Sequence, residues 1–331
     1  MRAIVFTEYG APDVLHLQDV EKPVPKDNEI LVKVRATSVG YGDLLARRLN
    51  EVTMREFNMP SLFLLMAKFY FGFRRPRVHV LGSEFAGEIE AVGKSVKSFK
   101  AKDQVFGYLG QNMGAYAEYV CVPETGTVDF KPANMTYEEA AVIPMGSIMA
   151  IHLLREMHIQ KGQNVLIIGA SGGIGSAAVQ IAKYYGAHVT GVCGAARFDF
   201  VKALGADEVL DYTKDDYQRN AARYDLIVDI LGRGSFSQAR NALKPNGKYL
   251  FVSFKIRQLI QAKRGKTADG KHAICGLAPG SKADLDAVRE LIVAGKMKSI
   301  IDKSFPMEQA AEAHRYAESG QRKGPVAITI A

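Results

Sequence analysis

Four glycines in one short segment, 169–175, have the spacing of a phosphate-binding turn. The segment stands between a continuous apolar run at 164–170, typical of a buried strand, and a helical pattern at 176–185. Glycines at such a turn let main chain approach a pyrophosphate, and the start of the helix offers free N–H groups and a positive dipole end. A plain tight turn is the alternative. We predict dinucleotide binding here, by Ala170, Ser171, Gly172, Gly173, Ile174 and Gly175.

The end of the next expected strand, His188–Cys193, bears on the form of the dinucleotide. A site for NAD carries Asp or Glu there, about twenty residues after the glycines, to hold the ribose hydroxyls. Here Gly194 follows and no acid is present, whereas Arg197 suits a 2′-phosphate. Asp199 is the competing acid, although its place is typical of the first turn of a helix. The pattern favours NADPH over NADH.

Length, charge and cysteine content narrow the class of protein. The chain has 331 residues, enough for two domains, and a formal net charge of +8 that suits an anionic ligand. Its basic residues are spread out, so we expect no nucleic-acid binding. Three distant cysteines without a CxxC pair argue against a disulfide framework and a structural zinc site. The start carries no signal-peptide pattern, so we expect a cytoplasmic protein.

One segment, Met59–Phe73, is strongly apolar. It is fifteen residues long, carries Lys68 and is followed by Arg74 and Arg75. A membrane-spanning helix needs about twenty apolar residues, so we expect no stable membrane insertion. A buried helix or a lid over an apolar pocket is favoured over a helix lying on a membrane surface, and a dimer face is a further alternative.

The elements that must position these residues are of two kinds. Before residue 125, alternating stretches separated by Pro and Gly indicate an antiparallel β domain. After it, apolar strands alternate with helices, as in a doubly wound parallel sheet. The tail resembles the first part, so we expect it to return there. The expected strands are 2–7, 29–38, 84–92, 103–108 and 114–122, then 164–170, 188–193, 208–211, 225–230, 249–254 and 273–277, then 300–305 and 326–330.

Seven segments carry a recognisable succession of motifs: Gly82–Gly93, Lys102–Gly107, Gly114–Val120, Ala140–Pro144, Gly169–Gly175, Leu204–Asp207 and Phe305–Tyr316. In this order they resemble the medium-chain dehydrogenase/reductases over nearly the whole chain. The resemblance implies an α/β fold with a Rossmann doubly wound parallel sheet and a GroES-like, mostly antiparallel β domain, with the active site in the cleft. It implies a GroES-like catalytic domain in 1–125, a Rossmann domain in 126–277, a return to the catalytic domain in 278–331, and a homodimer.

Within that family the chain resembles the zinc-free quinone oxidoreductase branch. Zinc alcohol dehydrogenases place a cysteine ligand where this chain has Gly40 and a histidine ligand where it has Ser83, and the four-cysteine lobe is missing too. The resemblance therefore implies no zinc. Without a Lewis acid, the suitable substrates are small hydrophobic acceptors that are already activated. We expect hydride transfer from NADPH to quinones or α,β-unsaturated carbonyls.

The resemblance also suggests further site residues. Tyr41 and Asp43 occupy the loop that carries the first zinc ligand in zinc-containing relatives, so they are the catalytic candidates. Tyr41 either hydrogen-bonds or protonates the acceptor, or only packs, and a structural role is favoured for Asp43. Tyr212 matches a position that contacts the adenosine ribose or its phosphate in related reductases. The nicotinamide side is expected, from position in the sheet, at Leu231, Gly232 and Ser253.

Two other functions remain open. The same scaffold serves enoyl-thioester reductases, and a fold alone does not exclude a dinucleotide-binding protein with a structural or regulatory task. Turnover of simple quinones or enones, exclusive use of CoA esters, or tight cofactor binding without turnover would distinguish the three.

Overall fold

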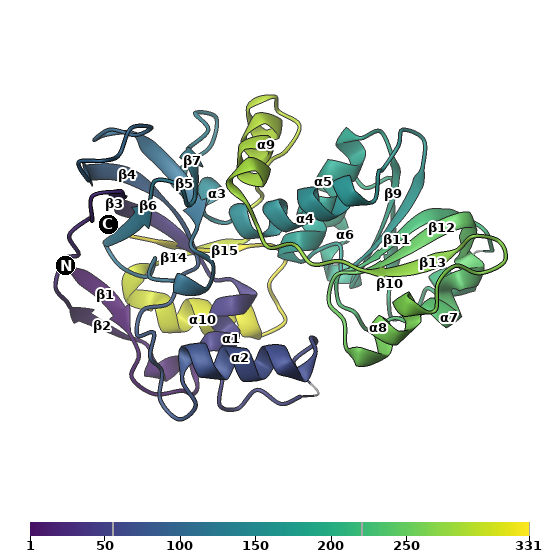
Figure 1. The fold of residues 1–331 in the computed structure, drawn as a ribbon, viewed down its shortest axis with the longest axis horizontal. Helices are drawn as coiled ribbons and strands as arrows, with labels where there is room; N and C mark the ends of the chain where they lie inside the picture. The colour runs from purple at the N-terminus through teal and green to yellow at the C-terminus, as the bar shows by residue number, and fades with distance from the viewer. Residues whose placement is uncertain (55, 220, 331) are drawn as a thin grey trace. The chain divides into compact units, whose positions relative to one another are not determined.

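The computed structural model of the chain describes residues 1–54, 56–219 and 221–330. The chain divides into two compact units (Figure 1). The first unit consists of Met1–Val52, Leu65–Met145 and Gly280–Ala331. The second unit consists of Thr53–Leu64 and Gly146–Pro279. Residues 126–145, which we had assigned to the Rossmann domain, are grouped with the first unit.

A mixed sheet forms the first unit. Its strand order is β14-β15-β3-β4-β5-β7, with β6 also paired to β3; every pair is antiparallel except β14 with β15. The last strand, β15, pairs with β3 through Ala327 opposite Ser38, so the end of the chain completes this sheet. The strands are β3 (Glu29–Ser38), β4 (Glu84–Val92), β5 (Gln104–Tyr108), β6 (Tyr119–Pro123), β7 (Thr127–Phe130), β14 (Lys303–Pro306) and β15 (Val326–Thr329), beside a separate hairpin of β1 (Arg2–Val5) and β2 (His16–Asp19).

The second unit is built on a six-stranded sheet in which all pairs are parallel. Its order is β10-β9-β8-β11-β12-β13, so the chain winds outward from β8 in one direction and from β11 in the other. This confirms the predicted doubly wound sheet. The strands are β8 (Asn164–Ile168), β9 (His188–Cys193), β10 (Glu208–Asp211), β11 (Tyr224–Asp229), β12 (Leu243–Phe251) and β13 (His272–Cys275).

Helices connect these strands, and several were not predicted from the sequence. The helix expected at 176–185 forms as α5, whereas α4 and α8 were not predicted. The helices are η1 (Pro12–Val14), α1 (Tyr41–Arg47), α2 (Ser61–Phe71), η2 (Gly110–Asn112), α3 (Tyr137–Ala141), α4 (Pro144–Glu156), α5 (Gly173–Tyr184), η3 (Ala195–Arg197), α6 (Phe198–Ala203), η4 (Tyr217–Arg219), α7 (Phe236–Ala239), η5 (Arg240–Ala242), α8 (Ile256–Lys263), α9 (Lys282–Val293), η6 (Met307–Gln309) and α10 (Ala310–Glu318).

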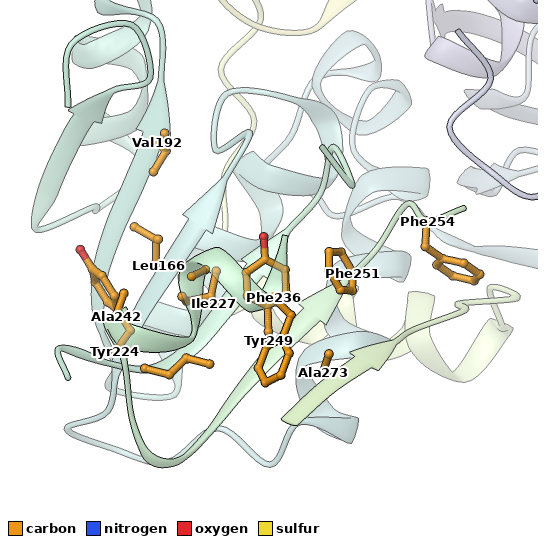
Figure 2. Packing of buried hydrophobic residues seen from close by; sticks show 12 residues of the cluster. Leu166, Val192, Tyr224, Ile227, Phe236, Ala242, Tyr249, Phe251, Phe254 and Ala273 are labelled. Atoms are coloured by element: carbon orange, nitrogen blue, oxygen red, sulfur yellow. The ribbon is translucent and has the colours of Figure 1, made fainter. Parts of the chain in front are cut away.

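An aromatic cluster fills one side of the parallel sheet. Figure 2 shows Phe236, Tyr249 and Phe251 among its members, and all three are buried. The rings of Tyr249 and Phe251 lie 4.6 Å apart between centroids, and Phe236 meets Tyr249 edge to face at 6.4 Å. Each fully buried ring stabilises the fold by about 1.5–3 kcal/mol. The cluster thus fixes β11 and β12, whose carboxyl ends carry predicted site residues.

A buried histidine fixes α1 within the first unit. His314 of α10 lies with its Nε2 atom 2.9 Å from the hydroxyl of Tyr116, while the Nε–H group of Arg47, at the end of α1, donates to its Nδ1 atom over 3.2 Å. Arg47 also donates to the carbonyl of Gly10 and, over 2.6 Å, to the carboxylate of Glu318. Burial, and secondarily the charge of Arg47, lowers the pKa of His314 to about 3. The ring is therefore neutral at physiological pH.

The three cysteines are free thiols. Cys121 and Cys275 are half-buried and Cys193 is buried. Burial raises the pKa of each thiol to about 11. All three are therefore protonated at neutral pH.

Candidate functional site

The glycine turn joins β8 to α5 as the sequence predicted. Gly169 has φ +86°, a conformation that favours glycine, and its carbonyl accepts a hydrogen bond of 3.0 Å from the N–H of Gly172. The N–H groups of Gly169 and Ala170 both donate to the carbonyl of Val192, which ties the turn to β9. Backbone hydrogen bonds alone, within the turn and to β9, thus hold its conformation.

Two glycines at this turn have different steric roles. A Cβ atom on Gly175 would overlap the carbonyl oxygen of Gly169 and lie 2.8 Å from the Cα atom of Ala170, so only glycine lets α5 pack so closely. A Cβ atom on Gly172 would come no nearer than 3.5 Å to any atom, and one on Gly173 would meet nothing within 4 Å. The fold therefore requires Gly175, whereas Gly172 and Gly173 leave open space above the turn.

The start of α5 has the features needed to hold an anionic group. Its N-cap is Gly172, which has no side chain to bond the first-turn N–H groups, and the first turn contains no acidic residue. The leading N–H groups of a helix have no acceptor within the helix, and the dipole favours negative charge there. Gly173, Ile174 and Gly175 carry these groups, so the turn fits the pyrophosphate of a dinucleotide.

The residues predicted for the nucleotide end lie near one another. The ring of Tyr212 lies 3.4 Å from the position that a Cβ atom of Gly194 would take, and the N–H of Tyr212 donates to the carbonyl of Cys193. The half-buried Arg197 is close enough to Cys193 for its charge to oppose the burial that raises the pKa of that thiol. Asp199 is exposed in the first turn of α6. The segment Gly194–Arg197, which follows β9, contains no acidic residue, although Asp211 of the neighbouring strand β10 pairs with Cys193.

The loop after β11 brings together the residues predicted for the nicotinamide side. A Cβ atom on Gly232 would overlap the carbonyl oxygen of Ser253, and one on Gly169 would lie 3.2 Å from the Cγ atom of Leu231. The structure therefore places Leu231 beside the glycine turn and Gly232 against Ser253. All these loops follow carboxyl ends of neighbouring parallel strands, where ligands of doubly wound sheets bind.

Sequence reasoning missed the residue that shapes this loop. Asp229 is fully buried at the end of β11. Its Oδ1 atom accepts from the N–H of Gly232 over 2.8 Å, and its Oδ2 atom accepts from the N–H of Gly234 over 2.9 Å and from the Tyr249 hydroxyl over 3.1 Å. The amide of Gln258 donates to the carbonyl of Gly232 over 2.9 Å. An aspartate three and five residues before glycines was the available signal.

In the first unit, Asp43 is fully buried and its oxygens are used by the backbone. Oδ2 accepts from the N–H of Gly40 and Oδ1 from the N–H of Gly82, each over 2.9 Å. Burial raises the pKa of Asp43 to about 6, although these hydrogen bonds oppose the shift. Asp43 thus ties the start of α1 to the start of β4. Tyr41, two residues earlier, is 52% exposed.

Glu84, which lies within the motif segment Gly82–Gly93, is a second buried carboxylate. It accepts from the hydroxyl of Ser38 and, over 2.7 Å, from the N–H of Met145. Burial raises its pKa to about 7; these hydrogen bonds lower it, and the nearby charge of Asp43 raises it further. Burial also raises the pKa of Tyr108 to about 12, with a contribution from Glu84. Glu84, a carboxyl group whose pKa is near neutral pH, thus lies close to Asp43.

Positions 40 and 83 are adjacent in space. A Cβ atom on Gly40 would lie 3.8 Å from the Ser83 hydroxyl and 3.9 Å from a carboxylate oxygen of Glu84. Across residues 1–54, 56–219 and 221–330, no three His, Cys, Asp or Glu side chains are grouped so as to hold a metal ion. At this point Gly40 offers no donor atom and Ser83 offers a hydroxyl, where zinc would need three or four N, S or O ligands.

Comparisons with known proteins agree with this arrangement. Residues 26–132 match the alcohol dehydrogenase GroES-like domain, and residues 204–328 match the zinc-binding dehydrogenase family model. The chloroplast envelope quinone oxidoreductase homolog of Arabidopsis thaliana is 31% identical over 342 residues, covering 99% of this chain and 98% of that protein. The chain belongs to the medium-chain dehydrogenase/reductase superfamily, in its quinone oxidoreductase-like branch. The family resemblance seen in the sequence is thereby confirmed.

Other members of this superfamily align over the full length of the chain. The mitochondrial NAD(P)H oxidoreductase RTN4IP1 of Mus musculus is 29% identical, covering 100% of this chain and 89% of that protein. The solved structure of the quinone oxidoreductase from Coxiella burnetii superposes with a TM-score of 0.83 at 26% identity, covering 100% of this chain and 99% of that chain. This medium-chain dehydrogenase/reductase therefore has the superfamily's GroES-like and Rossmann layout.

Proposed function

We propose that the protein is an NADPH-dependent oxidoreductase that reduces quinones or α,β-unsaturated carbonyls without zinc. The observation that carries the proposal is the uncapped start of α5, which lies beside Leu231 at the carboxyl edge of the parallel sheet. Relatives named as quinone oxidoreductases and as an NAD(P)H oxidoreductase support the same class of reaction.

In this proposal the N–H groups of Gly173, Ile174 and Gly175 bind the pyrophosphate, with Ala170, Ser171 and Gly172 forming the turn beneath it. Arg197 pairs with the 2′-phosphate and Tyr212 lies against the adenosine ribose. NADPH is preferred because the segment directly after β9, Gly194–Arg197, carries no acidic residue that would repel a phosphate dianion. Leu231 and Gly232, on the loop that Asp229 holds in place, and Ser253, after β12, line the nicotinamide.

The side chains at positions 40 and 83 support the proposed absence of zinc. Gly40 has no donor atom, and a serine hydroxyl is a poor zinc ligand, so an unactivated ketone would receive no Lewis-acid help. Bound NADPH supplies a hydride to an acceptor carbon that conjugation already makes electrophilic. We propose that Tyr41 donates a hydrogen bond to the acceptor carbonyl, and that Asp43 positions α1 rather than touching the acceptor.

A steady-state assay tests this function. Pure protein is mixed with NADPH or NADH and with a simple quinone, a cyclic enone, an aldehyde or an enoyl-CoA, with and without prior chelation of metals. We expect turnover of the quinone or enone with NADPH, unchanged by the chelator. Exclusive use of the CoA ester, or activity that is lost with the metal, would contradict the proposal.

The variant Arg197→Ala tests the choice of cofactor. Loss of a charged hydrogen bond to the 2′-phosphate should raise the KM for NADPH by roughly tenfold to a hundredfold and leave that for NADH nearly unchanged. Asp199→Ala is the matched control, because it removes an exposed charge from the adjoining helix and should improve the use of NADPH slightly, if at all. Equal loss with both cofactors in Arg197→Ala would show that the residue does not read the phosphate.

A further inference from the structure

The helix α2 is apolar except for Ser61 and Lys68, and most of it is not buried. Leu64 and Phe71, seven residues apart, are buried, and Ala67 and Lys68 between them are half-buried, so one face packs on the protein. The rest of the helix and the residue beyond its last turn are exposed. The exposed large apolar side chains are Leu62, Phe63, Leu65, Met66, Phe69, Tyr70 and Phe73. Of the two possibilities favoured from the sequence, a fully buried helix is therefore not what the structure shows, while a lid over an apolar pocket stays a prediction.

The exposed face of α2 contains no charged residue. At 3.6 residues per turn, its apolar side chains cover an arc of about 160° without interruption. Met66 and Phe69, near the middle of this arc, are 56% and 59% exposed. A helix facing water normally carries its charged residues there, and soluble monomers rarely expose so continuous an apolar patch. This face therefore has the composition of a binding surface.

Basic residues border the apolar face. Arg74, Arg75 and Arg77 follow the helix directly and are exposed, and the sequence contains no acidic residue between Glu56 and Glu84. Neither Arg74 nor Arg75 forms an ion pair with any residue that the structure describes. An apolar face next to unpaired cations complements a surface that is apolar inside and anionic outside.

The end of the helix is fixed. The hydroxyl oxygen of Tyr9 lies 2.8 Å from the carbonyl oxygens of both Phe71 and Gly72, which share its single hydrogen. A guanidinium N–H of Arg77 donates to the carbonyl of Phe69, also over 2.8 Å. These bonds satisfy the last carbonyls of α2, which otherwise lack partners. The ring of Phe73 packs edge to face on that of Phe69, 4.9 Å between centroids. These contacts fix the conformation of the C-terminal end of α2 without a bound partner.

We propose that α2 and Arg74–Arg77 dock the protein on the surface of an anionic lipid bilayer. The helix has eleven residues, about 16 Å, and so lies in the interface rather than crossing a hydrocarbon core of about 30 Å. The structure contains no helix, in the residues described, that meets the length and hydropathy of a membrane span. The apolar arc enters the boundary of headgroups and acyl chains while the arginines meet lipid phosphates.

Charge favours a bilayer over a second copy of the chain as the occupant. Two copies meeting through this face would bring Arg74, Arg75 and their counterparts together, with no acidic residue from the same segment to separate them. The net charge of +8 adds to the attraction toward an anionic surface. Docking there would concentrate the protein where lipophilic acceptors dissolve, but the binding itself does not depend on the proposed reaction.

Vesicle flotation tests this proposal with the full chain. Vesicles of pure phosphatidylcholine are compared with vesicles containing 30% phosphatidylglycerol, at low and high salt. We expect the protein to float with the anionic vesicles and to be released by salt. Met66→Ser with Phe69→Ser should weaken binding at least tenfold, and Arg74→Ser with Arg75→Ser roughly thirtyfold, since each basic residue near an anionic surface contributes about fivefold. The control Val293→Ser changes an equally exposed apolar residue on α9 and should float like the wild type.

Three results would overturn the proposal. The wild-type protein fails to float with anionic vesicles, or the Met66 and Phe69 variant floats as well as the wild type. Alternatively, sedimentation velocity shows a wild-type dimer that this variant converts to monomers, while neither binds lipid. Circular dichroism and thermal melting establish that each variant is folded, and the arginine variant, which alters only exposed side chains, provides a second test if the apolar variant is unstable.

Discussion

At the scale of single residues, the two glycines of the phosphate turn can be separated experimentally. Gly172→Ala places a methyl group in open space, so stability should be unchanged while NADPH binding weakens at least tenfold, because the methyl group meets the ligand. Gly175→Ala forces a methyl group against the carbonyl of Gly169 and should cost roughly 1–3 kcal/mol of unfolding free energy. Thermal melts and calorimetric titration with NADPH measure both effects.

The control for this pair is Gly42→Ala. A Cβ atom on Gly42 would meet nothing within 4 Å, and the residue lies in α1, far from the phosphate turn in sequence. Its melting temperature should stay constant or rise slightly, because alanine is the better helix former. If Gly172→Ala bound NADPH as tightly as the wild type, the amides of α5 would not be where the cofactor binds.

Glu84 should make the free energy of unfolding depend on pH between about 4.5 and 7. Its folded pKa of about 7 lies above the usual value of 4.5, so the native state holds a proton that the unfolded state releases. The stabilisation is therefore complete below about pH 4.5 and is lost as the pH rises through about 7. In Glu84→Gln this loss should disappear, and the difference in unfolding free energy between pH 5 and pH 8 should shrink by roughly 2–4 kcal/mol.

Denaturant titrations of wild type and variant at several pH values between 4 and 8 measure this change. Glu88→Gln, at a partly exposed position on the same strand, is the control and should keep the wild-type profile. His314 acts in the opposite sense, since its depressed pKa costs stability below about pH 6.5, but it does so equally in both proteins. Identical slopes for wild type and Glu84→Gln would mean that Glu84 is ionised in the folded state throughout.

At the scale of elements, the loop after β11 depends on one carboxylate. Both oxygens of Asp229 accept a hydrogen bond from a backbone N–H, one of Gly232 and one of Gly234. In Asp229→Asn an NH2 group replaces one of these oxygens, so one hydrogen bond is lost and a buried backbone N–H has no acceptor. We expect a loss of roughly 1–3 kcal/mol in stability and weaker NADPH binding. Tyr249→Phe removes only the third donor and should lower NADPH binding much less. If Asp229→Asn bound NADPH as tightly as the wild type, the loop after β11 would not contribute to cofactor binding.

The comparison of prediction and structure is clearest at this same scale. Periodicity identified β8, β9, β10 and β11 almost to the residue, because strands covered on both faces are continuous apolar runs. It missed α4, whose first residues Pro144–Ser147 follow an apolar stretch with no polar cap. The depth of Asp43, Glu84 and Asp229 was also not predictable. A sequence pattern gives the type of a polar residue, whereas its burial depends on strands far away in the chain.

The exposure of α2 was likewise outside the reach of sequence. An apolar stretch of this length is typical of a buried helix, and only the fold shows that Leu64 and Phe71 suffice to attach it. Its neighbours Arg74 and Arg75 were noted only as a limit to membrane spanning. Their meaning changes once the face beside them is known to be exposed.

At the scale of the whole molecule, the first unit needs both ends of the chain. β15 lies between β14 and β3 and buries Val326, Ala327 and Ile328. A chain that stops after Gly324 should therefore fail to form the native sheet, because two strand pairings and their buried side chains are lost together. Far-ultraviolet circular dichroism and the soluble yield measure this. A chain that stops after Ile330 is the control, and native folding of the shorter chain would show that β15 is dispensable.

The protonated state of the three thiols also matters for the proposed reduction of conjugated acceptors. Quinones and enones alkylate proteins by adding to sulfur anions, and the anion is the only fast-reacting form of cysteine. With each pKa near 11, roughly one thiol in ten thousand is ionised at pH 7. We therefore expect the three thiols, whose pKa values are raised mainly by burial, to react only slowly with the electrophiles that we propose the protein reduces.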